Sequence, residues 1–268
     1  MAPLVSAQAC EGPSASSAQP PLLAMIATPL VQPPELRSIS ETARAVDRRT
    51  MPAVERFSAR DGTRLAYRHY PPRGPAAGPI AILIHGSSGS SASVHALADA
   101  LAADGVETFA PDIRGHGGSG TRGDIGYVGQ LEDDLADLAA LIRQTEATAP
   151  ITLLGHSAGG GFALRVAGSP IQNLFVRTVL LAPYLGYDAP TNRPKSGGWA
   201  SPDMPRILGL LALRSIGVGC CDALPGLAFA VPPNSEKTLV PAYSNRLMRH
   251  FATRGYRATS LPRPGRSH

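Results

Sequence analysis

The strongest chemical signal in the sequence is a serine flanked by glycines. Residues 155–159 read Gly-His-Ser-Ala-Gly, which matches the pattern G-x-S-x-G. An apolar run at 151–154 precedes the pattern and a helical pattern at 158–167 follows it, so we expect a sharp strand-to-helix turn. Such a turn strains the serine backbone and exposes its hydroxyl, and the glycines avoid a collision. Ser157 is therefore predicted to be an acyl-transfer nucleophile; the alternative is a Gly-Ser turn without a catalytic role.

A serine nucleophile needs hydrogen-bond donors for the oxygen that becomes negative during acyl transfer. We expect one donor to be the backbone N–H of Ala158, at the start of the helix that follows Ser157. The second donor is expected to be the backbone N–H of Ser87, in a loop at 85–90 that reads His-Gly-Ser-Ser-Gly-Ser. The alternative for this loop is a Gly/Ser-rich segment selected for flexibility.

A third motif, at 112–119, reads Asp-Ile-Arg-Gly-His-Gly-Gly-Ser. We expect Asp112 and Arg114 to be structural partners that hold a loop beside the pocket. His116 precedes Ser157 in the chain, and it too is interpreted as structural.

The elements that would position these motifs alternate between strands and helices. The segment 79–85 contains five consecutive apolar residues, which is typical of a strand buried on both faces of a parallel sheet. Asp-Gly at 61–62 predicts a hairpin between its flanking segments. Alternating strands and amphipathic helices predict an α/β fold with a mainly parallel sheet covered on both faces. The expected strands are 54–59, 64–70, 79–85, 106–110, 151–154 and 176–181, and the expected helices are 91–103, 130–146 and 158–167.

The three motifs, in this order and on these elements, resemble the α/β-hydrolase fold family. The D-x-R-G-H-G-x-S form resembles the branch that contains monoacylglycerol lipases and serine aminopeptidase-like hydrolases, and the resemblance covers about residues 54–250. It implies a serine hydrolase that cleaves an ester or amide through an acyl-enzyme, with a nucleophile elbow and an oxyanion hole. It also implies a His general base and an Asp or Glu that orients it, in the chain order Ser, acid, His.

The sequence departs from this family after residue 181. We expect a leader without structure at 1–52, a hydrolase core at 53–187, a lid at 188–240, and a helix with an irregular tail at 241–268. The family's last two strands are expected to be absent, through truncation or a lost reading frame near residue 257. His250 is interpreted as a packed or surface residue, His268 lies at a polar end, and Asp188 is an acid only in a variant arrangement. The alternative function is therefore an impaired or inactive hydrolase that retains only a binding pocket.

The composition of the chain argues against several other kinds of partner and site. The net charge is +5, but the arginines are scattered and aromatics make up 5% of the chain, so nucleic acid is not an expected partner. The sequence contains no uninterrupted stretch of about 18 apolar residues, so no membrane span is expected. The three cysteines, Cys10, Cys220 and Cys221, have no metal-ligand or disulfide spacing, which indicates a reducing, cytoplasmic setting. We expect no metal and no cofactor, and a small-molecule ester or amide with an apolar acyl group as substrate.

Overall fold

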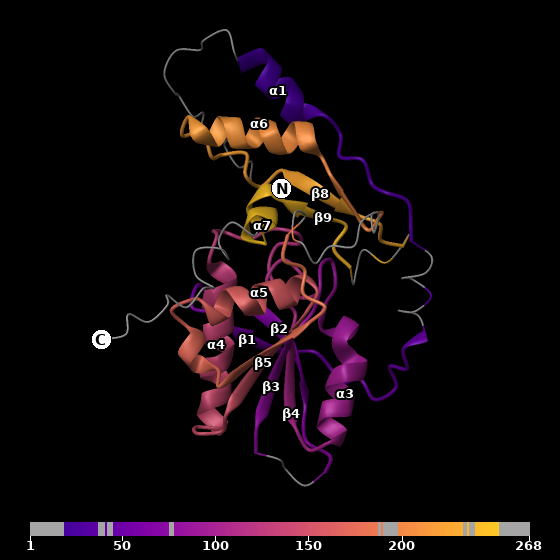
Figure 1. Cartoon of the computed structure of the whole chain (residues 1–268), viewed down its shortest axis with the longest axis vertical. Coiled ribbons are helices and arrows are strands. Elements are labelled where there is room, and N and C mark those ends of the chain that lie inside the picture. Colours follow the sequence, from indigo (N-terminus) through magenta and orange to yellow (C-terminus); the bar gives the residue numbers. More distant parts are fainter. Residues whose placement is uncertain are drawn as a thin grey trace, which may run out of the picture.

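The computed structural model describes residues 19–36, 41, 45–74, 78–186, 189, 198–232, 235 and 239–251. Within them the chain forms a main sheet of six strands and a second sheet of three strands. The main sheet has the spatial order β1-β2-β4-β3-β5-β6 (Figure 1). Its strands are β1 (Glu55–Ser58), β2 (Arg64–Tyr70), β3 (Ile80–Ile84), β4 (Glu107–Pro111), β5 (Ile151–His156) and β6 (Arg177–Leu181).

The centre of the main sheet is parallel. Strand β3 pairs in parallel with β4 and β5, and β5 pairs in parallel with β6. All five residues of β3 are buried, as expected of a strand that is covered on both faces. Strands β1 and β2 form an antiparallel hairpin, and Gly62 takes a left-handed φ of +79° in its turn. The structure thus confirms the predicted α/β fold and the predicted hairpin.

Helices cover both faces of the main sheet, because alternate residues of a strand point to opposite sides. Helix α3 (His95–Ala103) lies on one side, and α4 (Gln130–Thr145) and α5 (Ala158–Ala167) lie on the other (Figure 1). Within β3, Ile82 and Ile84 belong to the cluster that contains residues of α4 and α5. Leu83 belongs instead to the cluster that contains residues of α3.

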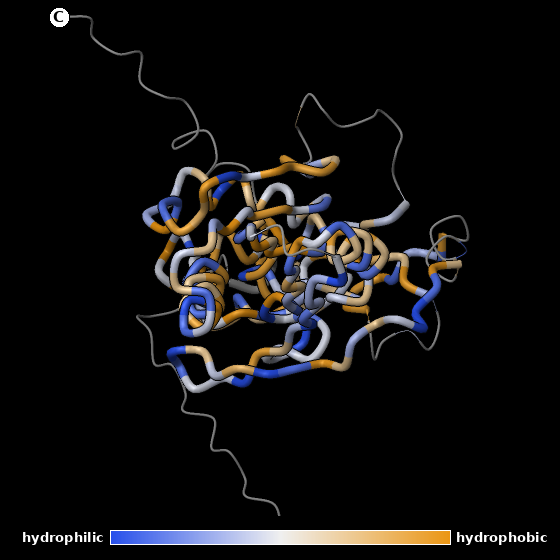
Figure 2. The backbone as a smooth tube through the Cα atoms, turned by 90° about the horizontal axis from the view of Figure 1, so that it is seen from below, coloured by the Kyte–Doolittle hydropathy of each residue, from blue (hydrophilic) through white to orange (hydrophobic). Residues whose placement is uncertain are grey.

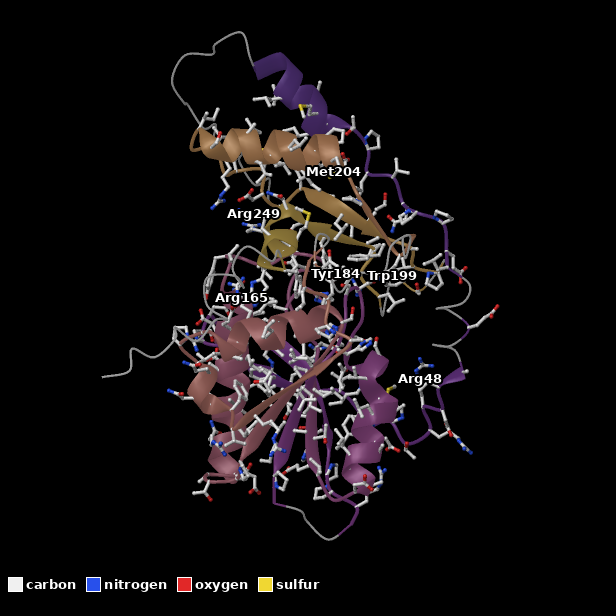
Figure 3. The ribbon with its side chains drawn as sticks, viewed as in Figure 1. Arg48, Arg165, Tyr184, Trp199, Met204 and Arg249 are labelled. Carbon is white, nitrogen blue, oxygen red and sulfur yellow. The ribbon has the colours of Figure 1, made fainter. Side chains whose placement is uncertain are left out.

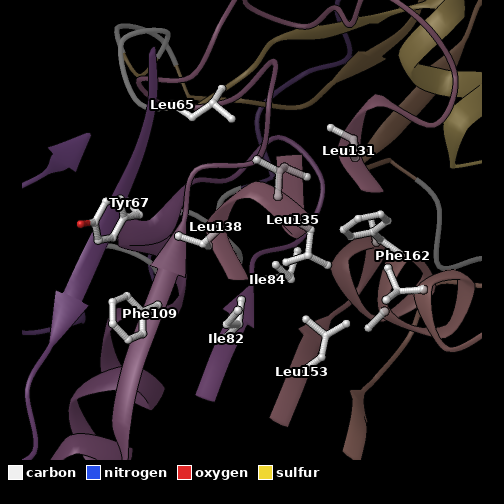
Figure 4. Close-up of a cluster of buried hydrophobic side chains, with 14 of the residues drawn as sticks. Leu65, Tyr67, Ile82, Ile84, Phe109, Leu131, Leu135, Leu138, Leu153 and Phe162 are labelled. Atoms are coloured by element: carbon white, nitrogen blue, oxygen red, sulfur yellow. The ribbon is translucent and has the colours of Figure 1, made fainter. Parts of the chain in front are cut away.

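The larger core cluster follows from the helical spacing of apolar residues in α4. These residues face β3, β4 and β5 and pack against Phe162 of α5 (Figure 4). Burial of such side chains is the main favourable term in folding, at about 25 cal/mol per Å² of apolar surface. The side chains labelled in Figure 4 are Leu65, Tyr67, Ile82, Ile84, Phe109, Leu131, Leu135, Leu138, Leu153 and Phe162.

The second sheet lies beyond the carboxyl end of the main sheet (Figure 1). It consists of β7 (Ala200–Pro202), β8 (Pro225–Phe229) and β9 (Ala242–Ser244), and β8 pairs antiparallel with both neighbours. Helix α6 (Met204–Ser215) joins β7 to β8, and α7 (Asn245–His250) follows β9. The expected boundary between lid and tail at residue 240 therefore runs through this sheet.

The N-terminal segment differs from the expectation of a leader without structure. Residues Gln19–Ala27 form helix α1, which packs along α6 (Figure 1). Ile26 forms a buried cluster with Leu210 and Leu213. A Cβ added to Gly209 would lie 3.0 Å from Ile26 Cγ2, so the glycine permits this close approach of the two helices. The apolar residues at 22–26 find a partner surface on α6 that the local sequence does not reveal.

Strand β6 is the last strand that the described residues contribute to the main sheet. Its residues are half-buried or exposed, and Val176, just before it, is 69% exposed. Hydrophobic stretches of the chain run through the middle of the molecule and also reach its periphery (Figure 2). Among the described residues, no strand follows β6 in the position that the two further family strands would take.

Candidate active site

Ser157 lies in the turn between β5 and α5, where its backbone is strained. It has φ 54° and ψ −119°, and it is one of three non-glycine residues with positive φ in the described chain. Its N–H donates to the Leu181 carbonyl at 3.0 Å, and its own carbonyl accepts from Tyr184 N at 2.8 Å. A serine in such a conformation persists only when its surroundings fix it, and strained residues of this kind cluster at functional sites.

The two flanking glycines are required by the tightness of this turn. A Cβ added to Gly155 would lie 2.1 Å from the Gly159 carbonyl oxygen, and one added to Gly159 would lie 2.4 Å from the His85 carbonyl oxygen. Neither distance is compatible with a side chain. The glycine spacing of the sequence motif thus has a direct steric cause in the structure.

The loop after β3 contacts the turn that carries Ser157. A Cβ added to Gly86 would lie 3.1 Å from Ser157 Cβ. Among the described residues, neither the backbone N–H of Ser87 nor that of Ala158 donates a hydrogen bond. Ala158 is buried as the first residue of α5, where the helix dipole favours negative charge. The structure therefore places the loop that contains Ser87 next to the turn that contains Ser157 and Ala158.

A segment distant in sequence fixes this loop. Ser88, with φ 63°, donates from Oγ to the Val240 carbonyl at 2.6 Å and accepts from Val240 N at 2.8 Å through its own carbonyl. Its N–H donates to the Tyr243 phenol oxygen at 2.7 Å, and the Ser87 hydroxyl also interacts with this phenol. Sequence reasoning missed Tyr243 and Val240, because neither lies in a recognisable motif.

Two buried histidines complete this contact. Tyr243 Oη lies 2.6 Å from His116 Nε2, and the His116 ring contacts the His85 ring at a centroid distance of 4.9 Å. His85 Nε2 accepts from the Ile113 N–H at 3.2 Å. Burial lowers the pKa of both imidazoles, so both rings are neutral at pH 7. Both histidines support the loops around Ser157, in agreement with the structural interpretation of His116.

The motif at 112–119 forms a loop held by charges. The Asp112 carboxylate accepts from the backbone N–H of Ser91 at 2.7 Å and of Gly118 at 2.8 Å. The Arg114 guanidinium donates two hydrogen bonds to the Asp134 carboxylate, at 2.8 and 2.7 Å. Although burial opposes the charge, these hydrogen bonds raise the pKa of Arg114. Both residues act as the structural partners that the sequence predicts.

The structure does not bring a general base to Ser157 within the described residues, where no side chain hydrogen-bonds the serine hydroxyl. His250 is fully buried in α7, and burial lowers the pKa of its imidazole to about 3. Its Nε2 lies 3.7 Å from Glu132 Oε2, and its ring packs against Phe162. His250 is thus a packed residue, as predicted. Asp188 and His268 lie outside the described residues.

Aromatic side chains occupy the region between α5 and the second sheet. Tyr184, whose N–H bonds the Ser157 carbonyl, and Trp199 lie in this region, and Met204 lies on α6 above it (Figure 3). The Trp199 ring contacts Phe229 of β8 at 5.8 Å between centroids. An open hollow is lined by Arg56 and other residues of β1, β2 and α4, and Ser157 is not among them.

Comparison with known proteins identifies the class to which this fold belongs. Residues 76–216, just over half of the chain, match the family described as "Serine aminopeptidase, S33". The chain belongs to this family and has the α/β-hydrolase fold. The resemblance inferred from the three motifs is thereby confirmed.

Individual relatives match over a smaller part of the chain. A monoacylglycerol lipase of Mycolicibacterium smegmatis is 31% identical over 39% of this chain and 38% of its own length. A monoglyceride lipase homolog of Monkeypox virus is 30% identical over 41% of this chain and 40% of its own length. The matches thus span about two fifths of these relatives. The structure of a monoglyceride lipase of Saccharomyces cerevisiae, at 20% identity and a TM-score of 0.53, covers 79% of this chain and 71% of that one, and shares the fold.

The described residues form neither a membrane-spanning helix nor a metal-binding cluster. No helix among them combines the length and the hydrophobicity that a membrane span requires. Within the same residues, no group of three or more His, Cys, Asp and Glu side chains is arranged to hold a metal ion.

Proposed function

We propose that this chain is a serine hydrolase that cleaves an ester bond through an acyl-enzyme on Ser157. The observation that carries the proposal is the positive φ of Ser157 at the β5–α5 turn, enforced by glycines that tolerate no side chain. This geometry supports a nucleophile elbow, a turn that lifts the serine hydroxyl from the end of the sheet. In the reaction, Ser157 Oγ bonds to the substrate carbonyl carbon and its proton passes to a base, which returns the proton to the alcohol as it leaves. Water then attacks the acyl-enzyme and releases the carboxylic acid, which restores the serine hydroxyl.

The oxyanion hole in this proposal consists of the backbone N–H groups of Ala158 and Ser87. Both groups lie in segments that contact Ser157, and neither donates to another described residue. The N–H of Ser88 is unsuitable because it already donates to the Tyr243 phenol. Preorganised donors of this kind are usually the largest single contribution to the rate enhancement. Removal of one donor lowers kcat by about 10²–10³.

The substrate class follows from the apolar surroundings and from the relatives. Trp199, Leu227 and Phe229 make the second sheet apolar where it packs on the core, and this apolar environment supports an apolar acyl group. Two of the matched relatives are described as a monoacylglycerol lipase and a monoglyceride lipase homolog, and they support a small ester with an aliphatic acyl chain as the proposed substrate class. An amide substrate is the other member of the same reaction type.

Labelling with a fluorophosphonate probe tests the proposal. The activated serine attacks the probe phosphorus, and the leaving group departs, so the label stays on Oγ. We expect labelling of the wild type and its loss in Ser157→Ala. Ser215→Ala is the matched control, because Ser215 is exposed at the end of α6 and donates only to the Ala212 carbonyl. An unlabelled wild type, or equal labelling of Ser157→Ala, would contradict the assignment.

The second candidate function is binding without turnover. It is favoured by one observation, which is that no described side chain hydrogen-bonds the Ser157 hydroxyl. A serine without a base is a weak nucleophile at neutral pH. Hydrolysis of a short p-nitrophenyl ester above background, abolished in Ser157→Ala and retained in Ser215→Ala, would support the hydrolase. A folded protein that binds the ester but neither hydrolyses it nor reacts with the fluorophosphonate would support the binding function.

A further inference from the structure

Strand β1 lies at an edge of the main sheet, and within the described residues it pairs only with β2 (Figure 1). At Ala59, which follows β1, the N–H donates to the Thr63 carbonyl at 2.9 Å, so the backbone groups of Ala59 point into the hairpin. These groups alternate in direction along an antiparallel strand. Those of Phe57 therefore also point toward β2, whereas those of Arg56 and Ser58 point away from it.

The outward backbone groups of β1 are open to a further strand. Among the described residues, no group outside the hairpin donates to or accepts from the backbone of Arg56 or Ser58. Both residues are exposed, whereas Phe57 between them is buried. A row of unpaired N–H and carbonyl groups at a sheet edge is a template for the addition of a strand from another chain.

A hollow of about 410 Å³ lies along this edge, between β1 and the C-terminal half of α4. Phe57 is buried and Leu141 is half-buried, so the side of the hollow that faces α4 is apolar. An extended peptide that adds a strand to a sheet places alternate side chains in such a space. The lining includes Arg56, Phe57 and Ser58 of β1 and Ala140, Leu141 and Gln144 of α4.

The uncompensated charge beside the open edge is positive. Arg56 is exposed, and its side chain donates from Nη1 to the Gly118 carbonyl at 2.7 Å. By the register of the two strands, Arg64 of β2 lies on the same face of the hairpin. Neither Arg56 nor Arg64 forms an ion pair with a described residue, whereas Arg60 nearby is paired with Asp137. A carboxylate opposite Arg56 would therefore gain a charge-assisted hydrogen bond.

We propose that the edge of β1 binds an extended, acidic peptide segment of a partner protein, which joins the main sheet as an antiparallel strand. Residues that face each other across such a ladder project to the same side of the sheet. The peptide residue opposite Phe57 thus lies toward Leu141 and is apolar, and the residue opposite Arg56 carries a carboxylate. From the peptide's amino end the pattern is Thr-Val-Glu, with the threonine opposite Ser58.

Fluorescence anisotropy of the full chain with the peptide fluorescein-Gly-Ser-Thr-Val-Glu-Thr-Ser-amide tests this site. In the proposed register, the glutamate N–H donates to β1 and the valine N–H points away from it. N-methylation of the glutamate amide should weaken binding about 10-fold or more, whereas N-methylation of the valine amide should leave binding unchanged. Equal effects of the two methyl groups, or no saturable binding up to about 1 mM peptide, would overturn the proposal.

A charge exchange tests the side-chain contact. Arg56→Glu should weaken binding of the glutamate peptide about 10-fold or more, and a peptide with lysine in place of that glutamate should restore it. Arg177→Glu is the matched control, because Arg177 is exposed on β6, at the opposite edge of the same sheet. Failure of the lysine peptide to restore binding, or an equal loss in Arg177→Glu, contradicts the assignment.

A proline substitution tests the backbone contact independently. Ser58→Pro removes an outward N–H at an edge position, where proline is compatible with a strand, so binding should fall about 10-fold while far-UV circular dichroism stays unchanged. Gel filtration of the wild type distinguishes another occupant. A dimer that Ser58→Pro dissociates, without peptide binding to either form, would make a second copy of the chain the occupant of the edge and would overturn the peptide proposal.

Discussion

Removal of the Tyr243 hydroxyl should destabilise the protein far more than a conservative Tyr→Phe change usually does. Tyr243 is 2% exposed, and its oxygen accepts from Ser88 N at 2.7 Å and lies 2.6 Å from His116 Nε2. Phenylalanine retains the ring and its packing, so no cavity arises beyond the volume of one oxygen. Two buried polar groups then lose their partner, at about 1–3 kcal/mol each. The expected loss in the free energy of unfolding is about 2–6 kcal/mol.

Urea denaturation of Tyr243→Phe, followed by far-UV circular dichroism, measures this loss. The matched control is Tyr127→Phe, because Tyr127 is 48% exposed and its phenol donates to the surface carboxylate of Asp133. Surface substitutions of that kind usually change stability by no more than about 0.5 kcal/mol. Equal stability of the two variants would refute the idea that the Tyr243 phenol anchors the loop.

The same variant also tests the link to Ser157. If the Ser87–Ser88 loop supplies an oxyanion donor, loss of its anchor should slow fluorophosphonate labelling of the folded variant as well. Labelling rates are compared at a urea concentration where both variants remain folded. Destabilisation with an unchanged labelling rate would leave the phenol a structural role only, and would remove the loop from the proposed site.

Three further changes have defined outcomes. Gly155→Ala should abolish soluble expression, because its Cβ has no room, whereas Gly219→Ala, with nothing within 4 Å, should behave as the wild type. Burial lowers the pKa of His250 to about 3. The contribution of His250 to the free energy of unfolding is therefore complete above about pH 6.5 and is lost as the pH falls toward 3. His250→Phe should flatten this part of the stability-versus-pH curve. Ile26→Ala should cost about 2–5 kcal/mol in the free energy that resists opening of α1, measured by hydrogen exchange, whereas Leu23→Ala, at 56% exposed, should cost little.

The parts of the fold that the sequence could predict are those with strong local patterns. An apolar run such as 80–84 marks a buried parallel strand wherever it occurs, and Asp-Gly at 61–62 marks a hairpin. The second sheet had no such signal. Strands β7 and β9 have three residues each, and β7 ends at a proline. Their pairing with β8 depends on contacts between segments distant in sequence.

The candidate site likewise has one part that the sequence predicts and another part that depends on long-range contacts. The turn around Ser157 is dictated by five consecutive residues, because the glycines and the serine meet the steric demands of one bend. The anchors of the neighbouring loop are long-range, since Tyr243 is 155 residues from Ser88 and Val240 is 152 residues from it. A tyrosine in a short strand carries no local sign that its hydroxyl will bond a buried amide. Only the folded chain reveals that partner.

These anchors have a consequence for how the site would respond to substrate. Three hydrogen bonds join Ser88 to Val240 and Tyr243, and Ala242 follows Pro241 into the pairing of β9 with β8. The second sheet and the Ser87–Ser88 loop are therefore mechanically connected, and neither can shift by more than the tolerance of a hydrogen bond without breaking a buried contact. A substrate that moved the second sheet aside would thus also move the proposed oxyanion donor. A substitution that loosens β9 should therefore perturb the Ser87–Ser88 loop as well.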